Sequence, residues 1–258
     1  MPRFAANLTM LFNEIGFVDR FAAAARAGFA GVEYLFPYDY EPTQLQQALR
    51  QHRLTQVLHN LPAGNWAAGE RGIACHPDRT GEFAEGVEQA IRYAHALECP
   101  QVNCLAGIVP SSVDLAVARS TFVANLRFAA PRLKAAGVKL LIEPINTRDI
   151  PNFFLNRTVQ ALEVIDEVGS DNLFLQYDVY HMQIMEGDLS VTLERHLPRI
   201  AHIQVADPPK RNEPGTGEIN FGYLFNLLDK LGYAGWIGCE YKPAARTEDG
   251  LGWLVGSQ

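Results

Sequence analysis

The sequence lacks an excess of positive charge and any long apolar run. It has 22 Lys and Arg against 29 Asp and Glu, which gives a formal net charge of −7. A general nucleic-acid binder carries a basic patch or stripe, so we expect no nucleic-acid partner. The apolar runs are all shorter than the roughly 18 residues that a membrane-spanning helix needs, so we expect no membrane segment.

Cysteine is also scarce. Only four cysteines occur, and no two of them form a C-x-x-C pair. The opening stretch MPRFAANLTMLFNEIGF contains Asn, Thr and Glu among its apolar residues and does not resemble a signal peptide. Reduced, mostly buried thiols are typical of cytosolic proteins. We therefore expect a cytoplasmic protein without a disulfide framework.

Short apolar runs alternate with longer amphipathic segments along the whole chain. This alternation is typical of βαβ units, which build a parallel sheet. The eight expected strands are Phe4–Leu8, Gly31–Leu35, Gln56–His59, Gln101–Leu105, Lys139–Glu143, Leu173–Asp178, His202–Val205 and Trp236–Glu240. The expected helices are Phe17–Ala27, Pro42–His52, Glu82–Leu97, Leu115–Ala136, Thr158–Val168, Leu189–Leu197, Phe221–Leu231 and a short one near Thr247–Leu254. Since a (β/α)₈ barrel typically needs about 250 residues, we expect residues 1–258 to form a single α/β domain, a TIM barrel.

Each expected strand ends in or near a polar residue. These residues are Asn7, Glu33, His59, Asn103, Glu143, Asp178, Gln204 and Glu240. In TIM barrels the carboxyl ends of the strands build the active site. A lone acidic residue at a strand end is commonly a salt-bridge partner or a helix cap, but the last four strands all end in a polar residue, three of them acidic, which favours a shared site.

The last four strand ends supply three carboxylates and one amide, from Glu143, Asp178, Glu240 and Gln204. Buried together, the carboxylates would repel one another unless they were protonated or bound a cation. Because hard oxygen ligands suit Mg²⁺ or Mn²⁺, we expect these four residues to bind one such divalent metal. His181 follows Asp178 by three positions; it is either a hydrogen-bond donor to a substrate oxygen or a loop histidine.

Few basic residues lie near the expected strand ends, where they could bind an acidic substrate. Lys210 and Arg211 follow the seventh expected strand, Lys242 follows the eighth, and Arg71 lies in the long irregular segment 60–79. Arginine can donate two parallel hydrogen bonds to a carboxylate, although each of these residues alone is typical of a solvated surface. A loop as long as 60–79 is usually functional, and the alternative is a surface Ω-loop.

Taken together, the motifs resemble the hydroxypyruvate isomerase family, within the xylose-isomerase-like TIM barrels. The matching stretches are RFAANLTMLF, GVEYLFPYDY, LHNLPAGNWAAGERGIA, LLIEPIN, QYDVYHMQ, HIQVAD, EPGTGEIN and GWIGCEYKP. The resemblance implies that Glu143 and Glu240 are the proton donor/acceptor pair. It also implies an Mg²⁺ or Mn²⁺ site made by Glu143, Asp178, Gln204 and Glu240. The substrate-binding candidates are His181, Arg211, Lys210, His59, Glu70, Arg71 and Lys242.

The implied reaction interconverts hydroxypyruvate and tartronate semialdehyde, a small hydroxy-carbonyl acid pair, through an enediolate. It needs no nucleotide cofactor, and the G-x-x-G of Gly28 and Gly31 is not a dinucleotide fingerprint. Alternatives are a 2-oxotetronate isomerase or a ketose isomerase or epimerase; the strand-three loop and IEPIN favour the hydroxypyruvate side. From other classes, a metal-dependent endonuclease and a non-catalytic sugar-binding barrel stay open, and exposed helices could pair in a homo-oligomer.

Overall fold

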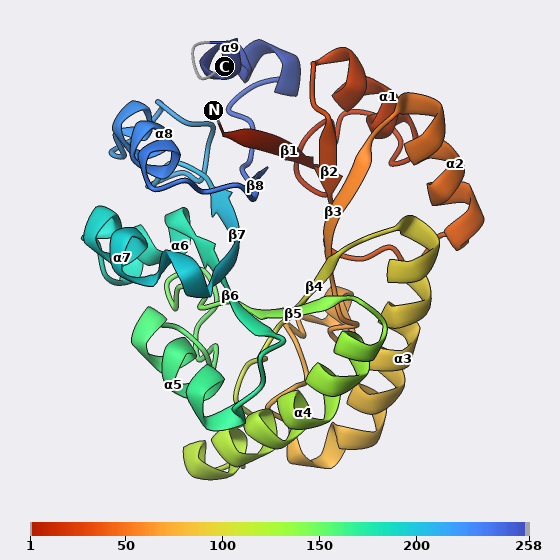
Figure 1. Ribbon diagram of the computed structural model, residues 1–258, viewed down its shortest axis with the longest axis vertical. Helices are drawn as coiled ribbons and strands as arrows, with labels where there is room; N and C mark the ends of the chain where they lie inside the picture. Colours follow the sequence, from red (N-terminus) through yellow and green to blue (C-terminus); the bar gives the residue numbers. More distant parts are fainter. Residues whose placement is uncertain (1, 256–258) are drawn as a thin grey trace.

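Eight parallel strands close into one barrel in the computed structural model, which describes residues 2–255 (Figure 1). Each strand pairs with the next along the chain, and β8 pairs with β1 to complete the ring. The strands are β1 (Arg3–Asn7), β2 (Gly31–Glu33), β3 (Thr55–Asn60), β4 (Gln101–Cys104), β5 (Lys139–Ile142), β6 (Leu173–Asp178), β7 (Ile200–Val205) and β8 (Trp236–Cys239). The prediction of a TIM barrel is confirmed.

Helices form an outer layer around the barrel (Figure 1). They are α1 (Asp19–Arg26), α2 (Pro42–His52), α3 (Thr80–Leu97), α4 (Leu115–Ala135), α5 (Thr158–Val168), α6 (Val179–Met185), α7 (Leu189–His196), α8 (Phe221–Lys230) and α9 (Gly252–Val255), with short 3₁₀ turns η1 (Trp66–Ala68), η2 (Pro77–Arg79), η3 (Leu197–Arg199) and η4 (Thr247–Gly250). Over residues 2–255, the helices are all too short or too polar to cross a bilayer.

Strand β5 illustrates how an apolar run is buried on both faces. Leu140 and Ile142 belong to the large core that extends into the helical layer, whereas Leu141 belongs to a small separate cluster with Ala5 and Leu58. Successive side chains of a strand point to opposite faces, so this division follows from the backbone. The small cluster closes the barrel interior below the polar strand ends, because Leu58 also lines the cavity there.

Five strands end one or two residues earlier than expected, namely β1, β2, β4, β5 and β8, and one α-helix was not expected. Strands β5 and β8 end at Ile142 and Cys239, so Glu143 and Glu240 each lie one residue beyond the ladder. After Glu143 comes Pro144, which has no N–H to continue the ladder. Helix α6 begins directly after β6, where the sequence had indicated only a strand end and a turn.

A candidate acid–base site at the carboxyl end of the barrel

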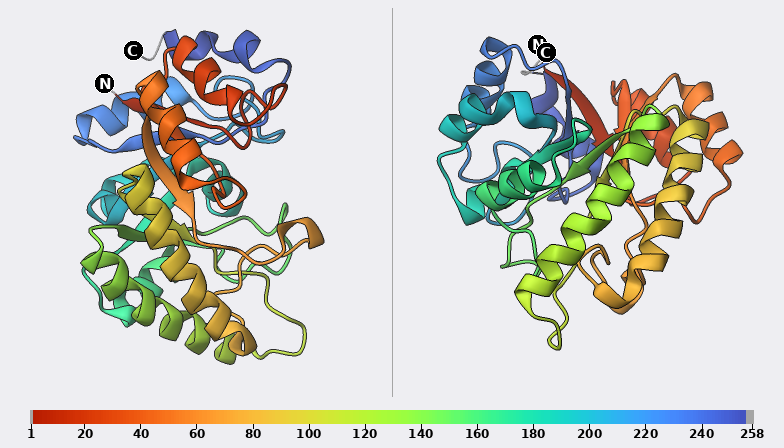
Figure 2. Two further views of the ribbon diagram at one scale, coloured as in Figure 1. Left: turned by 90° about the vertical axis from the view of Figure 1, so that its right-hand side faces the viewer. Right: turned by 60° about the horizontal axis from the view of Figure 1, so that its bottom comes forward.

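The long connections gather on one face of the molecule, seen at the right in the left-hand view of Figure 2. A cavity of ≈ 620 Å³ opens on this side, and residues from both halves of the chain line it. Glu143, His181, Gln204 and Glu240 are among its lining residues. The expected location of the site, at the carboxyl ends of the strands, is therefore where the polar residues meet a cavity.

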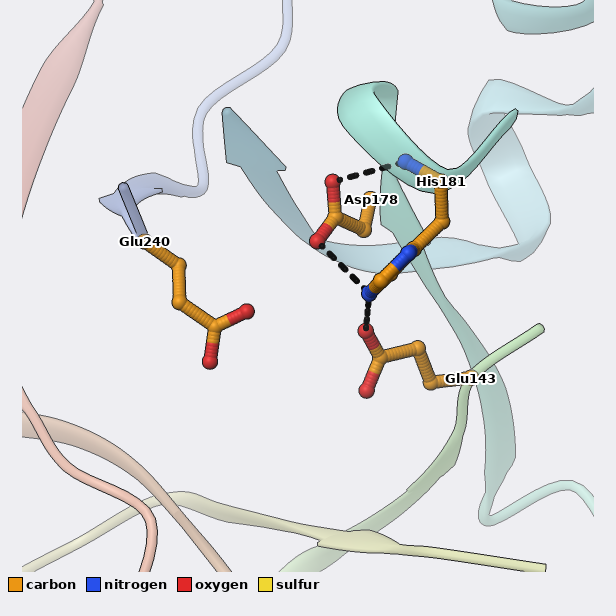
Figure 3. A group of neighbouring side chains, drawn as sticks. All are labelled: Glu143, Asp178, His181 and Glu240. Atoms are coloured by element: carbon orange, nitrogen blue, oxygen red, sulfur yellow. Dashed lines mark hydrogen bonds and ion pairs between the residues drawn. The ribbon is translucent and has the colours of Figure 1, made fainter. Parts of the chain in front are cut away.

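Four ionisable side chains converge beside this cavity (Figure 3). Glu143, Asp178, His181 and Glu240 each offer one ligand atom, and these atoms all lie within 4.8 Å of one another. Figure 3 shows His181 between Asp178 and Glu143, with Glu240 approaching from the opposite side. His181 Nε2 lies 3.5 Å from Asp178 Oδ2 and 3.9 Å from Glu143 Oε1. The structure thus places His181 within the cluster rather than in a loop outside it.

Asp178 owes its orientation to helix α6, because it is the N-cap residue of that helix. Its Oδ1 accepts hydrogen bonds from the main-chain N–H groups of Tyr180 (2.7 Å) and His181 (3.3 Å). Aspartate is a preferred N-cap because its side chain satisfies N–H groups that lack a partner within the helix. With Oδ1 used in this way, Oδ2 is the oxygen that faces His181 and the cluster.

The two glutamates are each held by amide side chains. Asn103 Nδ2 donates to Glu143 Oε2 (2.9 Å), and Asn7 Nδ2 donates to Glu240 Oε1 (3.3 Å). Arg211 adds a charge-assisted hydrogen bond to Glu240 Oε2 (2.6 Å). These contacts fix both carboxyl groups on opposite sides of one cavity, as proton transfer between two positions of a bound molecule requires.

Burial dominates the electrostatics of the cluster. It raises the pKa of Glu143 well above the usual range, and the nearby Glu240 and Asp178 raise it further. Burial likewise raises the pKa of Asp178, and it raises the pKa of Glu240 to about 8 even though Arg211 opposes both shifts. The pKa of His181 is held well below its ordinary value, first by burial and then by Arg211. The protein by itself therefore favours the uncharged forms of these groups.

The donor set of this cluster fits a divalent cation. Three carboxylates converge in a buried position, and Asp178 Oδ2 has no hydrogen-bond partner among residues 2–255. Arg211 is one charge against three carboxylates, so a buried carboxylate oxygen without a hydrogen bond remains costly unless a further cation or a proton accompanies it. The residues present could therefore hold a hard metal ion such as Mg²⁺ or Mn²⁺.

The fourth predicted ligand, Gln204, lies on the strand next to Asp178 and in register with it. Its amide is already engaged: Nε2 donates to Glu33 Oε1 (2.7 Å), and Oε1 accepts from Gln176 Nε2 (2.6 Å). The sequence had indicated Glu33 only as a polar strand end, and Gln176 had not been singled out. Two signals were available in the sequence. Gln176 lies two residues before Asp178 and so on the same face of the strand, and Glu33 lies at a strand end.

The remaining candidates divide into those that line the cavity and those that do not. Arg71, Arg211 and Lys242 line it. Lys210 is exposed and is not among the lining residues. Arg211, with 15 % of its side chain exposed, also lies 3.7 Å from Asp178 Oδ2. Of the cations that line the cavity, Arg211 is thus the one that contacts the acidic cluster.

His59 and Glu70 lie outside the cavity. Because Leu58 and Asn60 line the cavity, His59 between them points the other way and packs edge-on against Tyr38. Glu70 binds Arg79 within its own loop, with a distance of 2.5 Å between Nη1 and Oε1. In the positions described, neither side chain reaches the place where a substrate would meet the acidic cluster.

The segment 60–79 is an ordered wall of the cavity. Gly72 N–H donates to the carbonyl of Ala63 (3.0 Å), and Cys75 N–H donates to the carbonyl of Ala106 (2.8 Å), beyond β4. A Cβ at Gly72 would overlap the main chain of Leu105, so this position needs glycine. The loop that carries Arg71 is therefore packed on its neighbour, in keeping with a functional loop.

We expect the metal-free protein to lose stability as the pH rises above neutrality. Between 4.5 and the raised value of about 8 for the pKa of Glu240, the folded state holds a proton that the unfolded chain has lost. Stability then falls with rising pH, and the loss is complete above the folded-state pKa. Glu240 alone contributes about 2 kcal/mol between pH 6.5 and 8, at about 1.4 kcal/mol per pH unit.

Urea unfolding of EDTA-treated protein at pH 6.5 and pH 8 measures this effect. The low pKa of His181 acts in the opposite direction, but only below about its ordinary value of 6.5. Glu240→Gln removes the titrating group and should flatten the pH dependence. A free energy of unfolding that is constant or rises over this interval would contradict the expectation.

A closed parallel barrel with ionisable groups gathered at its carboxyl end defines a TIM-barrel enzyme. The chain belongs to the xylose isomerase-like TIM barrel family, which matches residues 21–256. It is 54 % identical to the hydroxypyruvate isomerase of Escherichia coli K12 and 50 % identical to the 2-oxo-tetronate isomerase of Cupriavidus necator H16, in each case over 98 % of both chains. The resemblance drawn from the motifs is confirmed, and the chain is an isomerase.

A solved structure supports the same placement. A crystal structure described as AP endonuclease, family 2, from Brucella melitensis is 46 % identical to this chain. The two superpose with a TM-score of 0.97 over 99 % of each chain. The fold is therefore shared closely by proteins whose names refer to different chemistry.

Proposed function

We propose that the chain interconverts hydroxypyruvate and tartronate semialdehyde, with Glu143 and Glu240 as the proton carriers. The observation that supports this most directly is the convergence of the two carboxyl groups from opposite sides of one cavity. In the proposed site Glu143, Asp178, Gln204 and Glu240 bind Mg²⁺ or Mn²⁺. Such an ion would stabilise the negative charge that develops on two neighbouring substrate oxygens.

The proposed chemistry moves protons within the substrate. One carboxylate removes a proton from C3 of hydroxypyruvate, which gives an enediolate, and a proton returns at C2. The C3 hydroxyl loses its proton and becomes the aldehyde, and the C2 carbonyl oxygen gains a proton and becomes a hydroxyl, so the protons balance and no electron leaves the molecule. Asn103 and Asn7, by holding Glu143 and Glu240, keep the two carboxyl groups from turning away from the substrate.

Among the three cations that line the cavity, Arg71 is proposed to bind the substrate carboxylate. Arg211 already faces Glu240 and Asp178, so most of its charge is used. Arg71 stacks over Trp66 at 4.1 Å, and its Nη1 donates to the carbonyls of Trp66 and Glu70. Among residues 2–255, no carboxylate lies within ion-pair distance of the Arg71 guanidinium group. Its remaining donors are thus pre-oriented for an anion.

Arg71→Met is expected to raise KM for hydroxypyruvate by about 10- to 100-fold, because a hydrogen-bonded charge pair contributes about 1.5–3 kcal/mol. It should have little effect on dihydroxyacetone, in which a hydroxymethyl group replaces the carboxylate. Steady-state kinetics on both compounds measure the difference. Arg132 provides a matched control on α4, since it also stacks on an aromatic ring, that of Phe128, and donates to its carbonyl. Equal losses on both compounds would contradict the assignment.

Proton NMR of hydroxypyruvate with the purified protein tests the proposed function. Signals of tartronate semialdehyde should appear with Mg²⁺ or Mn²⁺ and should be suppressed by EDTA. Parallel reactions with 2-oxotetronates and ketoses test the alternatives within the family. Abasic-site DNA tests the activity for which the Brucella melitensis protein is named. Binding of a sugar without exchange of its C–H protons for solvent deuterium would instead indicate a non-catalytic barrel.

A further inference from the structure

A buried carboxylate, Glu33, lies at the floor of the cavity and joins three strands from inside the barrel. Its side chain is on β2, and only 1 % of the residue is exposed. Oε1 accepts hydrogen bonds from Asn7 Nδ2 (3.0 Å) and Gln204 Nε2 (2.7 Å), and Oε2 lies 2.7 Å from His202 Nε2. Asn7 is on β1, and Gln204 and His202 are on β7.

These contacts set the direction of two amide groups. Glu33 Oε1 accepts from both Asn7 and Gln204, so the Gln204 amide turns its NH₂ group toward Glu33. Its oxygen then faces Gln176, which must donate its own NH₂ group in return (2.6 Å). Amide orientations are defined by such networks, and here the carboxylate removes the ambiguity.

The consequence lies at the end of this chain of hydrogen bonds. Because the NH₂ group of Gln176 donates to Gln204, the Oε1 atom of Gln176 is left as a free hydrogen-bond acceptor. That oxygen is buried and has no partner among residues 2–255, while the residue, 2 % exposed, lines the cavity. Leaving a buried acceptor unpaired costs free energy, so the position suits a ligand that donates a hydrogen bond.

We propose that Gln176 Oε1 accepts a hydrogen bond from the hydroxyl group of the substrate that is remote from its carboxylate, and that Glu33 is the positioning residue that keeps this acceptor facing the cavity. This assignment rests on the proposed function. It orients the substrate with its carboxylate at the rim, near Arg71, and its hydroxyl at the floor. A 3-hydroxy-2-oxo acid is then preferred over the corresponding acid that lacks the terminal hydroxyl.

The close approach of Gly238 to Glu33 agrees with this arrangement. A Cβ at position 238 would overlap the carboxylate of Glu33. The barrel wall therefore leaves room for the carboxylate only because β8 has a glycine there. The glycine therefore makes the position of the carboxylate possible, and the hydrogen bonds hold it there.

The test compares the binding of glycerate and lactate, which differ only in the terminal hydroxyl, by calorimetry with the Mn²⁺-loaded protein. The wild type should bind glycerate at least about tenfold more tightly than lactate, since one hydrogen bond contributes about 1.4 kcal/mol. In Gln176→Met this preference should fall by about tenfold, with the affinity for lactate unchanged; any preference that is left comes from the proposed ion, which would contact the same hydroxyl. Glu33→Gln should reduce it, and the double variant should show no further loss, because both residues act through one acceptor.

Gln56→Met is the matched control. Gln56 is 1 % exposed, its Oε1 is also unpaired among the described residues, and it is absent from the cavity lining. This variant should keep the preference for glycerate. Should Glu33→Gln fail to fold in thermal melts, Glu33→Asp tests the same contact, because its shorter side chain withdraws the carboxylate from Gln204.

Two results would overturn the inference: a wild type without preference for glycerate, or a Gln176→Met variant that keeps it in full. If the losses of glycerate preference add up in the double variant, Glu33 does not act by positioning Gln176. The outcome is separate from that of the proposed function, because calorimetry needs no turnover. If the protein shows the preference but does not isomerise hydroxypyruvate, the role of Gln176 as acceptor stands and the proposed reaction is wrong.

Discussion

Glu143→Gln and Glu240→Gln are each expected to lower kcat by at least about 10³-fold, within the range that general acid–base groups contribute. Glutamine has the size of glutamate and can still accept the hydrogen bonds from Asn103 and Asn7 that hold these positions. It cannot carry a proton between two carbon atoms. Proton NMR rates at saturating metal and substrate measure the loss, and circular dichroism checks the fold.

A charge change away from the cavity serves as the control. Glu167→Gln removes a carboxylate that pairs with Arg119 on the outer helices, and it should leave kcat within about twofold, as expected for a surface substitution. A near-normal kcat for Glu143→Gln or Glu240→Gln, with metal supplied, would exclude that residue as a proton carrier. Exchange of substrate C–H protons for solvent deuterium gives an independent readout of the same step.

Asp178→Asn is expected to weaken Mn²⁺ binding by more than about 100-fold, beyond the 10- to 100-fold that loss of a residue supporting a ligand costs. Asparagine keeps the cap of helix α6, because its Oδ1 can still accept from the N–H groups of Tyr180 and His181. It replaces the unpaired Oδ2 with an NH₂ group, which cannot ligate a cation. Turnover should fall in parallel, as it should when EDTA removes the metal from the wild type.

Electron paramagnetic resonance of free Mn²⁺ measures this affinity without any substrate. Asp188→Asn is the matched control, since Asp188 is the residue at the start of helix α7 and is exposed. It should leave Mn²⁺ binding unchanged. An Asp178→Asn variant with wild-type affinity would show that the ion binds elsewhere or does not bind.

The barrel could be predicted from the sequence because its signal is repeated. Each strand is a short apolar run followed by a polar residue, and an error in any one boundary leaves the others intact. The position of Glu143 and Glu240 just past the ladder did not affect their expected place at the carboxyl end. Fold and approximate site location therefore follow from residue patterns that are local in the chain.

Which side chains point into the cavity was harder to predict, because it depends on which face of each strand is turned toward the barrel interior. The sequence placed His59 at a strand end, as it did Glu143, but β3 continues to Asn60 and His59 faces the other side of the strand, against Tyr38. Glu70 stands next to Arg71 in the sequence, but its partner, Arg79, lies nine residues further along the chain. A charge within a loop does not reveal which other charge it will meet.

Networks between strands were the least predictable feature. Gln176 and Gln204 are 28 residues apart, and each looks like an ordinary polar residue of a buried strand. Only the closure of the barrel brings them together with Glu33, 171 residues from Gln204. By contrast, the cap made by Asp178 has a local signature, an aspartate directly before a helix, and closer attention to it would have predicted α6.

The glycine at position 238 has a consequence for redesign. Because any larger residue there would compete with the Glu33 carboxylate for the same space, position 238 cannot be enlarged while Glu33 is present. A redesign that aims at longer acids should therefore leave Glu33 and Gly238, at the floor of the cavity, unchanged. Variation belongs at Trp66, which lines the cavity next to Arg71, while Arg71 itself is kept to bind the carboxylate.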